Sequence, residues 1–363
     1  MDAPRRILVI VTRRIGDVLL ATPLIRSLKQ AWPDTSIDAL VFAGTEGVLA
    51  GNPDVDQIHV VTERPALSTH VSLLARLFRR YDLALSLVPG DRPTLYAWFV
   101  GQHRIGLLID RPGQRWKRYL LDRWVGFDPH NTHTVRNHLA LAGALDIPQL
   151  AAVIPAWRED DAAAVNVLLG KSCAPLAVIH PYPKFRYKMW HESGWIEVAR
   201  WLTENGFRVA LTGGPDADER TYVDAIAREL PEALNLTGRL SLGGIAALLA
   251  RAKFYVGPDT AITHMAAASG VSTVALFGPS DPVKWGPWPH GHPPAFNPWR
   301  RLGSQHNGNV HIIQGNTACA PCGLEGCARR LDSRSECLLA IPAKTVINCL
   351  KSNIYIKQPR PIG

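Results

Sequence analysis

The chain has 363 residues, with 40 lysines and arginines against 31 aspartates and glutamates, and a formal net charge of +9. An apolar share of 47% excludes a wholly disordered chain, which requires low hydrophobicity together with a high net charge. The basic excess indicates an anionic partner: a nucleic acid, a phosphorylated small molecule or an acidic membrane surface. At about 100–200 residues per domain, the length predicts two or three domains.

Short apolar strands alternate with helices in the first half of the chain. Strands are predicted over residues 6–11, 36–42, 57–61 and 83–88, and helices over 18–32 and 67–80. Within the first helix, Thr22 and Pro23 are typical of an N-cap followed by proline at the first helical position. Such alternation predicts a parallel sheet that is covered by helices on both faces.

The same pattern restarts after residue 155. Helices are predicted over 159–169, 194–205, 218–230, 242–250 and 261–268, and strands over 175–180, 207–212, 253–256 and 273–277. Residues 278–318 are rich in Pro, Gly, His and Trp and are expected to form long loops, and a helical pattern returns over 341–357. We therefore expect two α/β domains, over 1–155 and 156–340, and a C-terminal helix and tail over 341–363 that packs back on the first domain.

The apolar segments are too short for a membrane span or a secretory signal. No apolar run approaches the roughly 18 residues that cross a bilayer. The first apolar stretch, Ile7–Val11, is shorter than the h-region of a signal peptide. These features predict a cytoplasmic protein.

Two motifs follow predicted strands and contain groups able to act on a ligand. Gly16 and Asp17 follow the first strand, at the edge where open parallel sheets bind ligands. The alternative interpretation is that Asp17 only caps a helix and Gly16 only makes the turn. Asp259, Thr260 and His264 lie at the start of a helix of small residues, where N–H groups and the helix dipole bind anions. Their alternative role is capping by the first two and core packing by His264.

Two further segments have the same placement. The loop over residues 180–190 contains Lys184, Arg186 and Lys188 after a strand, which suits a diphosphate or, alternatively, a solvated basic loop. Residues 277–282, Phe-Gly-Pro-Ser-Asp-Pro, form a tight turn after another strand. Each motif is weak by itself, and the chain contains no Walker A, GxGxxG or HExxH motif.

Taken together, these motifs resemble one enzyme family. The segments Ile7–Leu24, Asp259-Thr-x3-His264 and Phe277–Pro282 are similar in order and spacing to glycosyltransferase family nine, the ADP-heptose:lipopolysaccharide heptosyltransferases. The similarity runs from residue 6 to about residue 350. Within the family, the Arg14–Pro23 run, Asn52-Pro53 and the segment at His133 look more like the third heptosyltransferase than the first.

The resemblance implies a fold and a reaction. The fold is GT-B: two Rossmann-like domains with parallel sheets face each other across a cleft, and the C-terminal domain holds the nucleotide sugar. The family transfers heptose from ADP-L-glycero-D-manno-heptose with inversion, and it needs no metal in the site and no other cofactor. The acceptor is the anionic inner core of lipopolysaccharide, at the inner face of the cytoplasmic membrane. Catalysis then requires the two domains to close.

The resemblance also assigns roles by position. Asp17 matches the general base, and Lys188 matches the lysine that contacts the donor diphosphate. Asp259, Thr260, Ala261 and His264 match the donor-binding loop, and Leu240 matches an apolar residue against the adenine. The loop over 180–188 is one residue longer than in the first heptosyltransferase, and Tyr182 and Pro183 replace hydroxyl-bearing threonines there, so the contacts of those threonine hydroxyls are not expected in this chain.

Three alternatives remain open. A GT-B enzyme that uses a UDP- or GDP-linked hexose has the same motifs. A metal-dependent transferase requires an Asp-x-Asp motif, which Asp216 and Asp218 provide, although the resemblance makes Asp218 or Glu219 a ribose contact or a solvent-facing residue. A nucleic-acid-binding protein is suggested only by the charge, because no basic and aromatic recognition module is visible.

A cluster of cysteines and a cluster of cations complete the candidates. Cys319, Cys322, Cys327 and Cys337 have the number and spacing of a structural zinc site or, alternatively, remain free thiols. Residues 76–123 contain ten lysines and arginines against four acids. We expect this stretch, with Arg115, Lys117 and Arg118, to contact the anionic acceptor and the membrane surface; the alternative is a solvated basic face.

Overall fold

The computed structural model describes residues 3–64 and 67–355 and divides into two compact units. Unit 1 contains Met1–Ala156 and Gly291–Asn297, and unit 2 contains Trp157–His290 and Pro298–Gly363. The sequence did not predict that Gly291–Asn297 belongs to unit 1. In that segment the Pro294 carbonyl accepts a hydrogen bond from Arg136 Nε at 3.1 Å.

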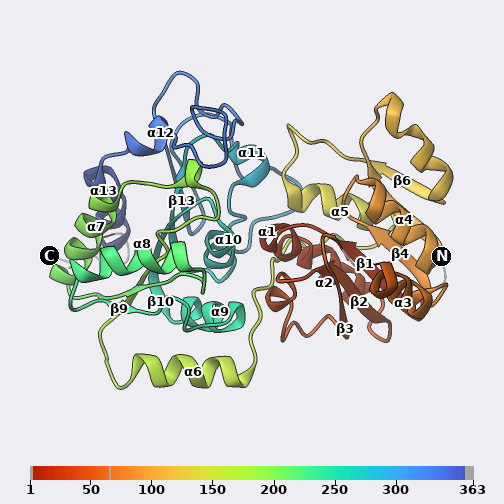
Figure 1. The fold of residues 1–363 in the computed structure, drawn as a ribbon, viewed down its shortest axis with the longest axis horizontal. Helices are drawn as coiled ribbons and strands as arrows, with labels where there is room; N and C mark the ends of the chain where they lie inside the picture. The colour runs from red at the N-terminus through yellow and green to blue at the C-terminus, as the bar shows by residue number, and fades with distance from the viewer. Residues whose placement is uncertain (1–2, 65–66, 356–363) are drawn as a thin grey trace, which may run out of the picture. The chain divides into compact units, whose positions relative to one another are not determined.

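Unit 1 is built on a six-stranded sheet in which all neighbouring strands are parallel, in the order β3-β2-β1-β4-β5-β6 (Figure 1). Its strands are β1 (Arg6–Val11), β2 (Ser36–Phe42), β3 (Gln57–Val61), β4 (Tyr81–Ser86), β5 (Gly101–Leu108) and β6 (Arg123–Gly126). Residues Ile7–Val11 of β1 are fully buried. A central strand that is buried on both faces is apolar throughout, which explains why the sequence predicted it so clearly.

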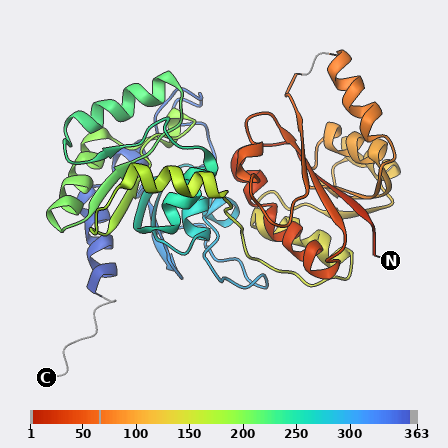
Figure 2. The same ribbon diagram turned by 90° about the horizontal axis from the view of Figure 1, so that it is seen from below.

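Helices cover both faces of this sheet. They are α1 (Ile15–Leu19), α2 (Thr22–Ala31), η1 (Glu46–Val48), α3 (Leu67–Leu77), α4 (Asp91–Val100), η2 (Pro112–Leu120) and α5 (Thr134–Ala144). Helix α2 packs against α5, and α3 packs against α4. Figure 2 shows α2 and α5 on one face of the sheet and α3 on the other. The single helix predicted over 18–32 is wrong: the chain breaks between α1 and α2, where Thr22 Oγ1 donates to the Leu19 carbonyl at 2.7 Å.

Unit 2 is built on a seven-stranded sheet in the order β12-β13-β11-β10-β7-β8-β9. Its strands are β7 (Leu176–Ile179), β8 (Arg208–Leu211), β9 (Leu234–Asn235), β10 (Ala252–Pro258), β11 (Ser272–Phe277), β12 (Gln305–Asn307) and β13 (Val310–Gln314). Among the strands of the described residues in this sheet, only β12 and β13 pair antiparallel. The expectation of loops throughout 278–318 is wrong, because strand β13 in this segment pairs with β11. The sequence did not predict β13 because this short apolar strand is flanked by loop-forming residues.

The helices of unit 2 were mostly predicted, and α6, α9 and α10 begin and end at the predicted residues. They are α6 (Glu159–Leu169), η3 (Arg186–Lys188), α7 (Glu192–Glu204), α8 (Ala217–Arg228), α9 (Leu242–Ala250), α10 (Ala261–Ala268), α11 (Pro282–Trp285), α12 (Glu336–Leu339) and α13 (Ala343–Tyr355). Each of α9 and α10 begins with a hydroxyl side chain at its N-cap, Ser241 and Thr260, that accepts a helix N–H. These caps fix where the two helices start.

The C-terminal helix α13 belongs to the core of unit 2. Val346 and Leu350 are fully buried in the same apolar cluster as Trp190 and Trp195, and α13 packs against α7 (Figure 1). The expectation that this part of the chain packs on the N-terminal domain is therefore wrong for α13, whose apolar side completes the core around the two tryptophans. Residues 356–363 lie outside the described residues. Within the described part of the chain, no helix has both the length and the apolar character needed to span a bilayer.

Candidate active site

The order in which the chain adds strands to the unit 2 sheet reverses between β7 and β10. From β7 the chain continues to β8 on one side, and from β10 it continues to β11 on the other side. In open parallel sheets, ligands bind beyond the carboxyl ends of the two strands at such a switch point. The segments that follow β7 and β10 are therefore the candidate binding residues, and they contain Lys188 and Asp259.

Lys188 and Asp259 form an ion pair at this switch point. Lys188 Nζ lies 2.5 Å from Asp259 Oδ2, and the Asp259 side chain is 7% exposed. Burial raises the pKa of Asp259, but the Lys188 ammonium and, when it is protonated, His264 lower it by more, so this pKa lies below its usual value. Asp259 is therefore a carboxylate at neutral pH, and it orients the Lys188 ammonium.

The loop that carries Asp259 is held by buried hydroxyl groups. Thr263 Oγ1 lies 2.9 Å from the hydroxyl of Tyr255, a fully buried side chain of β10, and it donates to the Pro258 carbonyl. Gly257 is required because the Tyr255 hydroxyl occupies the space that a Cβ atom would take. The position of Asp259 at the end of β10 is therefore fixed by its neighbours.

The N-terminus of α10 lies immediately after Asp259. Thr260 is the N-cap and Ala261 is the first helical residue, so the N–H groups of the first turn of α10 directly follow the residue that pairs with Lys188. His264, one turn into α10, is 5% exposed. Burial lowers the pKa of His264 to about 4, so this side chain is neutral at pH 7. Lys188 and the helix N-terminus thus supply the positive charge, and together they suit a diphosphate.

Leu240 lies at the same edge of the sheet. It directly precedes Ser241, the N-cap of α9, and its half-buried side chain lies against Gly244. In a β-α-β unit the helix runs antiparallel to its strands, so the N-termini of α9 and α10 both lie at the carboxyl edge. Leu240 is therefore placed beside the same edge as Asp259 and Thr260.

Two further residues support this edge: Ser280, which had no predicted role, and Glu219, which the resemblance made a ribose contact or a solvent-facing residue. The Ser280 side chain, after β11, hydrogen-bonds to Asp259 and lowers its pKa. Glu219, in the first turn of α8, accepts a backbone hydrogen bond from Gly214, and its pKa is raised mainly by burial. The strand followed by a turn at residues 277–282 predicts that Ser280 lies at a strand end. Its contact with Asp259 could not be predicted, because that contact depends on the order of the strands in the sheet. Tyr182 is half-buried, with its ring 5.4 Å from that of Tyr222, so it is part of the packing.

In unit 1, Asp17 lies at the corresponding position. The switch point of that sheet is between β1 and β4, and Asp17 follows β1. It is half-buried and is the third residue of α1, whose N-cap is Arg14. The alternative in which Asp17 is the helix cap is therefore wrong. A carboxylate in the first helical turn is stabilised by the helix dipole.

The three cations proposed to contact the acceptor have different environments. Lys117 is 1% exposed and its Nζ lies 2.7 Å from Asp91 Oδ1. Arg115 is 64% exposed, and Arg118 lies 2.7 Å from Asp110 and above the ring of Trp124. The expectation that all three contribute to one surface is wrong for Lys117, which the fold of η2 turns toward the interior.

The four clustered cysteines form no disulfide among the described residues. Cys319, Cys322 and Cys327 are exposed, and Cys337 is buried. Burial raises the pKa of the Cys337 thiol to about 11, with smaller contributions from the other three. Within residues 3–64 and 67–355, no three His, Cys, Asp or Glu side chains are arranged to hold a metal ion. Asp216 of the Asp-x-Asp motif accepts the Asp218 N–H as the N-cap of α8.

Two Rossmann-like parallel sheets, with a cation and a helix N-terminus at the switch point of the second, are typical of a GT-B glycosyltransferase. Comparison with known proteins identifies the family. The model of glycosyltransferase family 9 (heptosyltransferase) matches residues 73–293, and the chain belongs to this family. It is 30% identical over 294 residues to lipopolysaccharide heptosyltransferase 3 of Escherichia coli K12, covering 75% of this chain and 82% of that protein.

Solved structures of the same fold confirm the GT-B class. The structure of E. coli ADP-heptose lipopolysaccharide heptosyltransferase II matches with a TM-score of 0.75 at 23% identity, covering 98% of this chain and all of that chain. E. coli heptosyltransferase WaaC with ADP-2-deoxy-2-fluoro heptose matches with a TM-score of 0.70 at 18% identity, covering 96% and 99%. The protein is a glycosyltransferase.

Proposed function

We propose that this glycosyltransferase transfers heptose from ADP-L-glycero-D-manno-heptose to the inner core of lipopolysaccharide. The proposal rests on the family and on the relatives, which are named lipopolysaccharide heptosyltransferases. A structural relative holds an ADP-heptose analogue. The observation that carries the proposal is the Lys188–Asp259 ion pair at the N-terminus of α10, because it provides a site for a diphosphate.

The donor diphosphate binds through Lys188 and the backbone N–H groups that follow Thr260. Negative charge develops on the diphosphate as its bond to the anomeric carbon breaks. A fixed ammonium and a helix N-terminus stabilise that charge without reorganisation. Asp259 holds the ammonium in place, Ala261 and His264 shape the start of α10, and Leu240 packs against the adenine.

Asp17 is the general base. It takes the proton from the acceptor hydroxyl while the hydroxyl oxygen forms a bond to the anomeric carbon on the face opposite the diphosphate. The bond between that carbon and the diphosphate oxygen breaks, and ADP leaves with the electron pair. The anomeric configuration is therefore inverted, and no metal or other cofactor takes part. General-base catalysis contributes about 10²–10⁴-fold to a rate.

The acceptor is anionic and is presented at the inner face of the cytoplasmic membrane. Arg115 and Arg118 of η2 are the exposed and half-exposed cations that we assign to it. A guanidinium binds phosphate or carboxylate through two parallel hydrogen bonds, which suits a phosphorylated, carboxylate-bearing core. Lys117 instead holds η2 against the start of α4 through Asp91.

A thermal-shift panel of ADP, UDP and GDP tests the donor class. A ligand that binds only the folded protein raises its stability in proportion to ln(1 + [L]/Kd). We expect stabilisation by ADP alone. Stabilisation by UDP or GDP in its place would instead support a GT-B enzyme that uses a UDP- or GDP-linked hexose.

A further inference from the structure

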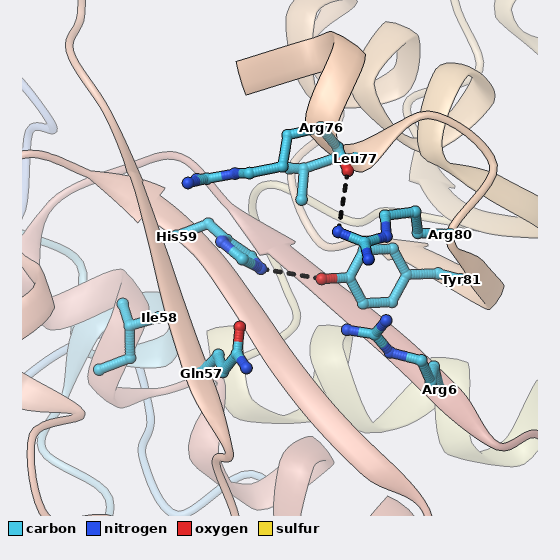
Figure 3. Close-up of a pocket in the computed structure, with 8 residues that line it drawn as sticks. All are labelled: Arg6, Gln57, Ile58, His59, Arg76, Leu77, Arg80 and Tyr81. Carbon is cyan, nitrogen blue, oxygen red and sulfur yellow. Dashed lines mark hydrogen bonds between the residues drawn. The ribbon is translucent and has the colours of Figure 1, made fainter. Parts of the chain in front are cut away.

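A pocket in unit 1 lies at the amino ends of the strands, whereas Asp17 lies beyond their carboxyl ends. It has a volume of about 400 Å³ and is lined by residues of β1, β3, β4 and the end of α3: Arg6, Gln57, Ile58, His59, Arg76, Leu77, Arg80 and Tyr81 (Figure 3). Arg6 begins β1, whereas Asp17 follows the other end of that strand. At about 3.3 Å per residue, the six residues of β1 separate the two sites by roughly 20 Å.

The floor of this pocket is a buried hydrogen-bonded network. Asp38, which is fully buried, accepts a hydrogen bond from the Tyr81 hydroxyl at 2.7 Å and from Arg6 at 3.2 Å. His59 Nε2 lies 2.8 Å from the same hydroxyl. Burial raises the pKa of Asp38, but His59, Tyr81 and Arg6 lower it below its usual value. The network therefore contains one carboxylate, Asp38, whose negative charge is balanced by the Arg6 guanidinium.

The guanidinium groups of Arg76 and Arg80 also line the pocket, and they differ from Arg6 in their ion pairing. In the part of the chain that the structure describes, no carboxylate lies within ion-pair distance of Arg76 or Arg80. Arg80 Nη1 donates to the Arg76 carbonyl at 3.3 Å, at the C-terminal end of α3. Figure 3 shows Arg6 and Arg80 on opposite sides of the Tyr81 ring, and Arg76 reaching over His59. The nearby Asp82 carboxylate accepts the backbone N–H of Arg6.

We infer that this pocket binds a small organic molecule that carries a phosphate monoester. Of the three arginines that line the pocket, Arg6 is paired with Asp38, and Arg76 and Arg80 are available to a phosphate monoester, which carries a charge of about −1.5 to −2 at pH 7. Its oxygens match the forked donors of guanidinium groups. The volume exceeds what a bare phosphate fills, and Ile58, Leu77 and the Tyr81 ring provide apolar walls with one amide, Gln57, among them.

Calorimetric titration of the full chain with glucose 6-phosphate, inorganic phosphate and glucose tests the inference. We expect glucose 6-phosphate to bind saturably, and more tightly than inorganic phosphate, and glucose not to bind. In the R76Q/R80Q double variant, the affinity for glucose 6-phosphate should fall by about tenfold or more. The control is R5Q, an exposed arginine outside the pocket, whose affinity should stay at the wild-type value.

ADP binding, measured on the same samples, reports whether each variant is folded and whether the two sites are separate. It should be unchanged in R76Q/R80Q. Equal affinity for glucose 6-phosphate in wild type and R76Q/R80Q, no binding to wild type, or equal affinity for inorganic phosphate would each overturn the inference. Arginine-dependent binding seen only to vesicles that contain phosphatidic acid would overturn the assignment to a free molecule and point to a lipid-borne phosphate monoester.

Discussion

Lys188 and Asp259 are 71 positions apart in sequence, and their charged groups meet at 2.5 Å. The pair joins the segments that follow β7 and β10, the two strands at the switch point of the unit 2 sheet. A buried carboxylate is stable only when it is paired and hydrogen-bonded. Asp259 therefore depends on Lys188, and Lys188 is held where a diphosphate would bind.

Replacing Lys188 by Gln should weaken ADP binding by about tenfold or more, because a charge-assisted contact to the diphosphate is lost. Isothermal titration measures the change. Lys184 is exposed in the same loop, and K184Q is the matched control, expected to bind ADP like wild type. Wild-type ADP affinity in K188Q would show that the pair is structural only.

The D17N variant should lose transfer activity by about 10²–10⁴-fold, the range of general-base catalysis, while ADP affinity stays unchanged. Steady-state release of ADP in the presence of acceptor gives kcat, and calorimetry gives the affinity. Asp34 is an exposed acid on the same unit, so D34N controls for the loss of a charge. Near-wild-type turnover of D17N would end the assignment of Asp17 as base.

His264 should make folding stability depend on pH. Its pKa in the folded protein is about 4, against 6.5 for the ordinary side chain. The unfolded chain therefore binds more protons between these values, and stability present above pH 6.5 is lost as the pH falls toward 4. The full loss is about 3 kcal/mol for one such histidine.

Urea unfolding at several pH values checks this expectation. The H264Q variant should lose less stability than wild type between pH 6.5 and 4, whereas H130Q, which alters an exposed histidine, should follow wild type. Parallel pH profiles for H264Q and wild type would rule out a buried neutral His264.

Neutralising the two accessible cations of η2 should affect the acceptor alone. In R115Q/R118Q we expect a several-fold rise in the KM for acceptor and no change in the KM for donor, since each lost guanidinium removes an exposed contact of about 1 kcal/mol or less. Equal changes in both constants would contradict the assignment. K117A should instead lower the free energy of unfolding by about 1–3 kcal/mol, because Lys117 is buried.

The cysteines should behave as thiols that differ in accessibility. In the native protein we expect Cys173, Cys319, Cys322 and Cys327, which are exposed, to react rapidly with a thiol reagent. Cys337 and Cys349 should react slowly, because burial raises the pKa of both thiols to about 11. Protection of all four clustered cysteines, together with about one equivalent of zinc in the purified protein, would instead establish a zinc site.

Much of the fold is predictable because strands and helices that are buried on all sides consist of apolar or small residues almost throughout. Strand β1 and helices α9 and α10 contain almost only apolar or small residues between capping or turn residues, and their predicted bounds agree with the structure. Residues 89–150 contain α4, β5 and α5, which no pattern indicated. Helix α4 buries Pro93, Tyr96, Ala97 and Val100 on one face, but it also exposes Leu95 and Trp98, so apolar residues do not mark the buried face alone.

The sequence predicts each part of the candidate site separately, but not how the parts come together. A sequence indicates that Lys188 and Asp259 each follow a strand, but only the strand order brings those ends together. The resemblance to a known family instead assigned both residues to donor binding. Lys117 shows the reverse case, because a lysine between Trp116 and Arg118 is expected on the surface. Its burial depends on Asp91, at the start of a helix that the sequence did not indicate.

Nucleotide release from purified wild-type protein tests the central claim most directly. The protein is incubated with ADP-heptose, or with a UDP- or GDP-linked hexose, with and without lipopolysaccharide core acceptor that lacks the added heptose. We predict ADP release from ADP-heptose alone, dependent on acceptor and unchanged by EDTA. Acceptor-dependent release of UDP or GDP, with none of ADP, would contradict the assignment of this enzyme as an ADP-heptose transferase.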